Sequence, residues 1–155
     1  MLGSAAAHQN GQAKALSFYY RGAILNRLGR YDQALMSLDQ ALTEASDLIL
    51  AQEERGESLW QLGRQEEAVA VWKSVISVKA DLPLSNNLLA GAAALQGQSA
   101  ESVAYEKQAD KFTPADPLFL WILGIRLQNV GMNDLAEKHF QRAIQLNPEF
   151  RKARN

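Results

Sequence analysis

The sequence predicts an all-α fold built from four helical hairpins in tandem. The first observation is a period: 63−29, 97−63 and 131−97 are each 34, and a glycine stands at every one of those four positions. The second is that apolar residues recur three or four apart inside each unit, which is typical of helices with one buried face. The third is that Gly or Pro separates the helical segments. Repeats of this length indicate an array of similar structural units.

Further series keep the same period. They divide the chain into repeats 15–48, 49–82, 83–116 and 117–150, which we treat as one domain over 15–150. A small residue recurs in the first half of each unit and another in the second half, and a bulky residue follows in all units but the third. The small series are Gly22, Gly56, Ala90, Gly124 and Ala34, Ala68, Ser102, Ala136; the bulky series is Leu38, Trp72, Glu106, Phe140.

The first unit shows how one hairpin is expected to form. Its first helix has a predicted buried stripe that includes Gly22, Leu25 and Leu28, and Gly29 then ends the helix in a left-handed C-cap. A second stripe follows from Tyr31. Small residues let two helices approach closely, so the small series is expected at the contact between the two helices of a hairpin. The bulky series is expected to fill the space to the next hairpin. Ser46 and Asp47 offer an N-cap for the next hairpin.

This pattern resembles the tetratricopeptide repeat, whose signature is W-x2-L-G-x2-Y, A-x3-F and P over 34 residues. The fourth unit fits best and the third, with Ser102 and Glu106, fits least. The resemblance implies a right-handed superhelix of antiparallel hairpins, with the first helix of each hairpin lining a concave groove that binds peptides. The matching residues of the fourth unit are Leu123, Gly124, Leu127, Ala136, Phe140, Ala143 and Pro148.

The two ends are expected to differ from the repeats. Residues 1–14 are predicted to be a flexible segment, of which residues 1–4 resemble a cloning remnant. Residues 151–155 are interpreted as a tail or a truncated capping helix. Because repeat arrays need polar caps, the last hairpin is expected to leave apolar surface bare around Phe140 and Ile144. Either the chain is cut from a longer protein, or this surface pairs with another molecule, including a second copy.

Composition excludes several classes. The net charge is −1, so no basic footprint for nucleic acid is present. No apolar run reaches the roughly 18 residues of a membrane span. The chain has no cysteine, which excludes disulfides and thiolate metal sites. We expect a cytoplasmic protein, with the periplasm as the alternative.

Residues suited to catalysis are few. His8 falls in the N-terminal segment, and His139 is interpreted as a solvated or half-buried structural histidine. Glu53, Glu54 and Glu57 form a carboxylate cluster in which Glu53 and Glu57 share a helix face. Paired carboxylates catalyse proton transfer when one is desolvated, but an exposed acidic stripe is the preferred interpretation. The sequence therefore predicts no enzyme activity, no cofactor and no metal.

A partner-binding groove is the predicted functional site. Its residues are taken from the face of each first helix opposite the packed stripe, where aromatic side chains in a polar setting are typical binding hot spots. Trp72 is assigned to the core instead. The predicted groove residues are Tyr19, Asn26, Arg27, Glu53, Glu57, Trp60, Asn87, Trp121 and Gln128.

The function that follows is a protein-interaction scaffold or adaptor that binds a peptide or protein surface, such as an assembly factor. A dedicated chaperone for a secreted or membrane-associated client is the alternative. Two hypotheses are weaker. One is an enzyme that uses Glu53 and Glu57, and the other is an RNA-binding repeat protein, which the nearly neutral charge argues against.

Overall fold

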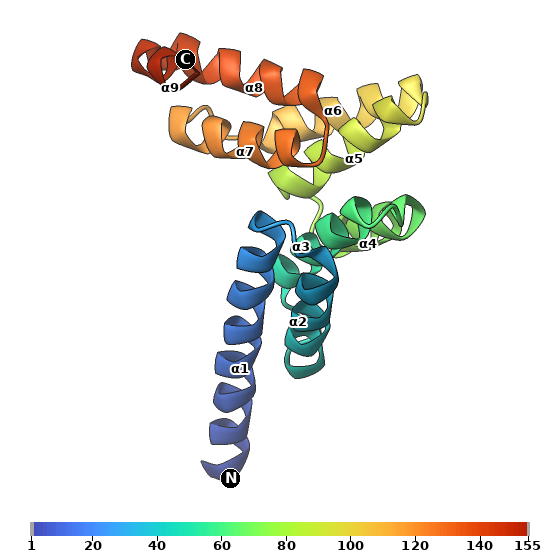
Figure 1. Cartoon of the computed structure of the whole chain (residues 1–155), viewed down its shortest axis with the longest axis vertical. Helices are drawn as coiled ribbons and strands as arrows, with labels where there is room; N and C mark the ends of the chain where they lie inside the picture. Colours follow the sequence, from blue (N-terminus) through green and yellow to red (C-terminus); the bar gives the residue numbers. More distant parts are fainter. Residues whose placement is uncertain (1, 155) are drawn as a thin grey trace. The chain divides into compact units, whose positions relative to one another are not determined.

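The computed structural model describes residues 2–154, and that part of the chain is all-α as predicted (Figure 1). Helices α3, α5 and α7 begin 34 residues apart, at the first residues of the expected second, third and fourth repeats. The helices are α1 Leu2–Arg27, α2 Tyr31–Glu44, α3 Ile49–Gln61, α4 Gln65–Val78, α5 Pro83–Leu95, α6 Ser99–Phe112, α7 Pro117–Asn129 and α8 Asn133–Leu146, followed by the 3-10 turn η1 Pro148–Phe150 and α9 Arg151–Arg154.

The chain divides into two compact units, Met1–Val75 and Ile76–Asn155, where the sequence pattern led us to treat 15–150 as one domain. The boundary falls near the end of α4. Each unit contains two consecutive hairpins and is described by itself.

Each hairpin turns at a glycine. Gly29, Gly63, Gly97 and Gly131 have φ between 74° and 82°, the left-handed conformation that other residues adopt only with strain. The amide of Gly29 donates to the carbonyl of Asn26 at 3.0 Å, and the amide of Arg30 donates to that of Leu25 at 2.9 Å. This pair of bonds is the Schellman C-cap, so the predicted role of the periodic glycines is confirmed.

In the first unit the bulky residues pack on the small residues of their own hairpin, where they were expected to fill the space to the next hairpin. A Cβ placed on Gly22 would overlap Leu38, and one placed on Gly56 would overlap Trp72. Helix α3 packs against both helices of the first hairpin, where Ala51 joins Leu38 in the core. The expected N-cap of α3 by Ser46 or Asp47 is wrong: Leu48 occupies the N-cap position and no side chain caps the helix.

In the second unit Phe140 fills the space beside Gly124 in the same way. Helix α8 also contacts α5, because Met132 at its start lies so close to Gly91 that a Cβ there would overlap it. Asp116 caps α7 by accepting a 2.9 Å hydrogen bond from the amide of Phe119.

The ends differ from expectation. Residues 2–14, predicted to be flexible, form the first half of α1, because alanine, lysine and glutamine in this stretch favour helix. Met1 and Asn155 lie outside the described residues. The expectation of bare apolar surface at the last hairpin is wrong, since Phe140 and Ile144 are both buried. Phe150 in η1 lies 5.4 Å, centroid to centroid, from the ring of Trp121 and packs over this end of the unit.

Candidate functional site

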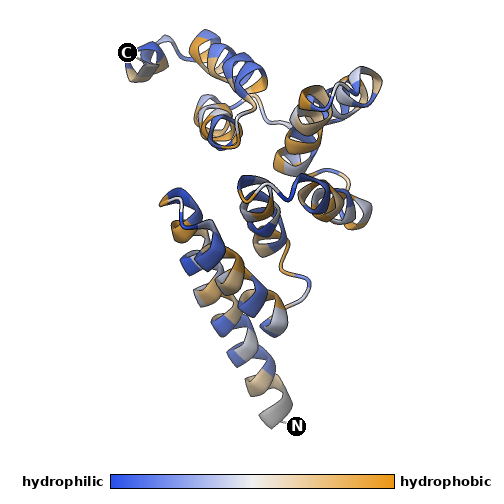
Figure 2. Cartoon of the chain, turned by 45° about the vertical axis from the view of Figure 1, so that its right-hand side comes forward, coloured by the Kyte–Doolittle hydropathy of each residue, from blue (hydrophilic) through white to orange (hydrophobic). Residues whose placement is uncertain are grey.

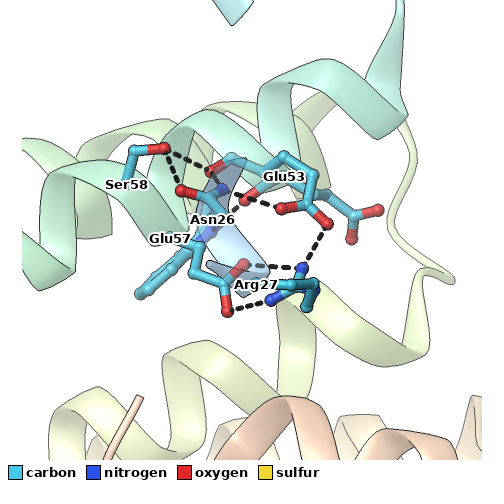
Figure 3. Close-up of polar contacts among 7 residues, drawn as sticks. Asn26, Arg27, Glu53, Glu57 and Ser58 are labelled. Carbon is cyan, nitrogen blue, oxygen red and sulfur yellow. Dashed lines mark hydrogen bonds and ion pairs between the residues drawn. The ribbon is translucent and has the colours of Figure 1, made fainter. Parts of the chain in front are cut away.

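A network of polar side chains joins α1 to α3 in the first unit (Figure 3). Arg27, near the end of α1, donates to Glu54 at 2.6 Å and to Glu57 at 2.9 Å. Asn26 donates to the second carboxylate oxygen of Glu54 at 2.8 Å and accepts from the hydroxyl of Ser58 at 2.7 Å. Two adjacent residues of α1 thus hold three residues from successive turns of α3.

Burial makes this network strong. Glu54 and Glu57 are almost fully buried, whereas about a third of the Arg27 side chain is exposed. Burial lowers the pKa of Arg27, but the Glu57 and Glu54 carboxylates more than compensate, so the pKa lies above its usual range. The guanidinium is therefore a permanent cation, and Coulomb attraction at this distance is large in a partly desolvated site.

The arrangement suits structure rather than proton transfer. A carboxyl that acts as a general acid needs a raised pKa, which an adjacent Arg opposes. The interpretation of Glu53 and Glu57 as an exposed acidic stripe is wrong, because both are buried, as is Glu54. The reason is the α1–α3 contact, which brings Arg27 over α3 from 27 to 30 residues away in sequence.

Several predicted groove residues are buried as well, which corrects their expected exposure. Trp60 is buried against Trp72, with ring centroids 5.9 Å apart. Asn26 is part of the α1–α3 network, and Asn87 is buried in the second unit. The carboxylate-bearing helix α3 is thus mostly interior, because a helix flanked by neighbours on several sides has little free face.

The remaining predicted groove residues are partly or fully accessible. Tyr19 is half-buried beside the Leu38 cluster. Trp121 is half-buried. Its ring packs at a tilt against that of Phe140, with 4.7 Å between centroids, so it completes packing inside the unit. Gln128 is exposed. The nine residues therefore do not form one accessible surface.

His139 in α8 is fully buried, not half-buried as expected. Its Nε2 lies 2.7 Å from the amide oxygen of Asn87 in α5, while Nδ1 has no hydrogen-bond partner. Burial, together with the nearby Lys138 ammonium, lowers the pKa of His139 to about 4. The imidazole is neutral at pH 7 and links α8 to α5.

An apolar face that the sequence analysis missed lies on α1. Leu16, Tyr20 and Ile24 are four residues apart and share one side of the helix. Leu28, directly after the last residue of α1, continues this spacing, and all four side chains are exposed. Leu28 was expected in the buried stripe. Figure 2 shows hydrophobic and hydrophilic residues alternating along this helix. The signal in the sequence was a second apolar stripe beside the buried one, at a constant spacing of four.

Helix α7 of the second unit has a similar exposed face, made of Leu118, Phe119, Ile122 and Ile125. Contiguous exposed apolar residues on a helix are unusual in a folded protein and mark interaction surfaces. Within residues 2–154, no cluster of His, Asp and Glu is arranged to hold a metal ion, and no helix is both long and apolar enough to cross a bilayer.

Comparison with known proteins identifies the fold. No protein-family model matches the sequence, and no curated protein matches it. Solved structures do. The chain matches "YrrB: a TPR protein with an unusual peptide-binding site" at 19% identity with a TM-score of 0.60, covering 94% of this chain and 74% of that one.

This chain has the tetratricopeptide-repeat fold. Two structures of MamA agree. One matches at 16% identity and a TM-score of 0.60, over 91% of this chain and 81% of that chain. The other, from Desulfovibrio magneticus RS-1, matches at 20% identity and 0.59, over 87% and 76%. In the tetratricopeptide-repeat fold α1, α3, α5 and α7 are the first helices of their hairpins, and it is two of these that carry the exposed apolar faces.

Proposed function

We propose that this protein is a protein-binding module whose contact surface is the apolar face of α1, defined by Leu16, Tyr20, Ile24 and Leu28. The observation that carries the proposal is the exposure of four large apolar side chains at a spacing of four, three on α1 and the fourth directly after its last residue. Removing such side chains from water is favourable by about 25 cal/mol per Å², so a partner that covers them gains affinity.

The support beneath α1 suits this role. Arg27 and Asn26 fix the end of α1 on α3, and Leu38 packs under Gly22. A face held on a rigid element costs little ordering entropy on binding. The spacing of four fits a partner segment with apolar side chains at matching intervals, including an amphipathic helix. YrrB, which shares the fold, is described as having a peptide-binding site, and this adds support.

Substitution of Ile24 tests the proposal. Peptides are selected from a displayed random library on the wild-type protein, and their Kd is measured by calorimetry for wild type and Ile24→Glu. We expect binding to weaken at least tenfold, because a charge would enter an apolar contact. Unchanged helicity by circular dichroism would show that the fold is intact.

Met36→Glu is the matched control. Met36 is 69% exposed and Ile24 is 59% exposed, and they lie on the two helices of the same hairpin. The proposal would be contradicted if the peptides bound Ile24→Glu as tightly as wild type. It would also be contradicted if Met36→Glu weakened peptide binding as much as Ile24→Glu. A chaperone role would use the same face, and a client that is soluble only when co-expressed with wild type, and not with Ile24→Glu, would favour it.

A further inference from the structure

A pocket of about 210 Å³ opens in the second unit between α5, α6 and the first turns of α8. Its α5 wall is small and apolar, made of Ala90, Gly91 and Ala94. Ser102 and Glu106 of α6 form a second wall. No residue of the α1 face and no predicted groove residue lines this pocket.

The position of this pocket in the repeat explains why it exists. In the other three hairpins the bulky series packs on the small residue 16 positions earlier: Leu38 on Gly22, Trp72 on Gly56 and Phe140 on Gly124. The corresponding pair in the third hairpin is Ala90 and Glu106, and both line the pocket. The third hairpin therefore keeps a small pocket at the slot where the other hairpins hold a bulky side chain, and its floor at Ala90 is only 1% exposed.

Glu106 leaves the slot open because α8 engages its carboxylate. Lys138 donates to Glu106 at 2.8 Å and to both carboxylate oxygens of Asp110 at 2.9 Å. Burial lowers the pKa of Lys138, but these carboxylates raise it above its usual range, so the ammonium stays charged. Ser102 is also engaged, since its hydroxyl donates to the carbonyl of Ala90 at 3.0 Å.

The volume of the pocket and the residues that line it determine which ligand it can hold. Pockets for drug-sized ligands measure about 300–1,000 Å³, so this one suits a single large side chain. The residues that fill the equivalent slots are Leu38, Trp72 and Phe140, two of them aromatic. A ring in the pocket would lie against the Ala90 methyl group and the Ala94 side chain. It would sit farther from α5 than the rings of Trp72 and Phe140 sit from their glycines, where a Cβ would overlap the ring.

The charged residues around the pocket determine which residues of a partner can flank the inserted ring. Two carboxylates, those of Glu106 and Asp134, line the pocket together with one ammonium, that of Lys138. Lys138 also bonds to Asp110. The excess of negative charge attracts a cationic segment and repels an acidic one. Lys138 already bonds to two of the carboxylates, which leaves it little capacity to bind an anion.

We propose that this pocket binds an aromatic side chain of a protein partner, inserted from a segment that carries Lys or Arg beside it. The partner would complete the third hairpin with the bulky group that its own sequence lacks. This inference does not use the α1 face, so it stands or fails independently of the function proposed above.

The test uses the full chain, labelled with ¹⁵N, and three five-residue peptides: Gly-Lys-Trp-Lys-Gly, Gly-Lys-Ala-Lys-Gly and Gly-Glu-Trp-Glu-Gly. We expect the first to shift the amide signals of Ala90, Gly91, Ala94 and Ser102. The other two should bind at least tenfold more weakly, one lacking the ring and the other carrying the wrong charge.

Glu106→Phe should fill the slot from within and abolish these shifts. Glu101→Phe is the control, because it places the same ring at an exposed position of α6, and it should bind the peptide like wild type. Glu106→Gln keeps the slot open and should bind the Lys-Trp-Lys peptide with a reduced preference over the Glu-Trp-Glu peptide, which tests the proposal if Glu106→Phe fails to fold. Equal binding of the Trp and Ala peptides, or shifts that persist in folded Glu106→Phe, would overturn it.

Discussion

The two units are built from the same 34-residue repeat but hold their hairpins together differently. In the first, both slots between paired helices are filled, by Leu38 and Trp72, and a charged network joins α1 to α3. In the second, the slot beside Ala90 is open, and a neutral Asn87–His139 contact joins α5 to α8.

This difference separates what a repeat must conserve from what it is free to vary. The glycine turns are alike in all four hairpins, because each needs a left-handed residue. The contacts between hairpins depend on single polar residues, and there the units diverge. Where Glu106 stands at the bulky position, the hairpin still forms, and Lys138 of α8 donates to the Glu106 carboxylate.

The largest expected effect comes from emptying a filled slot. Trp72→Ala should destabilise the protein by about 4 kcal/mol, the usual cost of removing a fully buried large aromatic side chain. Glu106→Ala, at the equivalent position of the open slot, should cost less than about 1 kcal/mol, since its ion pair with Lys138 is partly exposed. Urea denaturation measures both. Equal losses would show that the two slots are energetically alike.

Removing the cation of the first unit should have the next largest effect. Arg27→Met removes the cation that pairs with two buried carboxylates, and removing one side of a buried ion pair typically costs about 3 kcal/mol or more. Arg55→Met is the control, because Arg55 pairs with the exposed Asp39 at 2.7 Å, and such pairs contribute about 1 kcal/mol or less. A comparable loss in both variants, measured by chemical denaturation, would contradict the burial argument.

Acid should weaken the second unit through His139. In the unfolded chain this histidine has the usual pKa of 6.5, whereas in the folded unit it is about 4. Between these values the unfolded state binds more protons, so stability is complete above pH 6.5 and is lost as pH falls toward 4. The loss by pH 5 should be about 2 kcal/mol. His139→Gln should remove this part of the pH dependence, and an unchanged slope in that variant would refute the assignment.

The hairpins were predictable from sequence because they depend on local requirements. The glycine period and the helix stripes follow from spacing within one repeat. The pairs Gly22–Leu38 and Gly124–Phe140 were not predicted, because the bulky residues were expected to fill the space to the next hairpin. The burial of Glu57 was not predicted either, since its partner Arg27 belongs to the preceding hairpin. A glutamate on a helix is normally a sign of solvent exposure, and only the three-dimensional contact reverses it.

The candidate surface was missed for a related reason. The groove face of each first helix was predicted as the side opposite the buried stripe of that helix. This placed Trp60 and Asn87 in the groove. Neighbouring helices cover both. Ile24 and Tyr20 stay exposed because neither α2 nor α3 covers their side of α1, and a pattern within one helix cannot show which sides its neighbours occupy.

The measurement that tests the central claim most directly is amide hydrogen exchange of the protein with and without a selected peptide. We predict slower amide exchange confined to residues 16–28 in the wild type, and no change in Ile24→Glu. Protection that leaves residues 16–28 unchanged and appears elsewhere in the chain would show that the apolar face of α1 is not the binding surface.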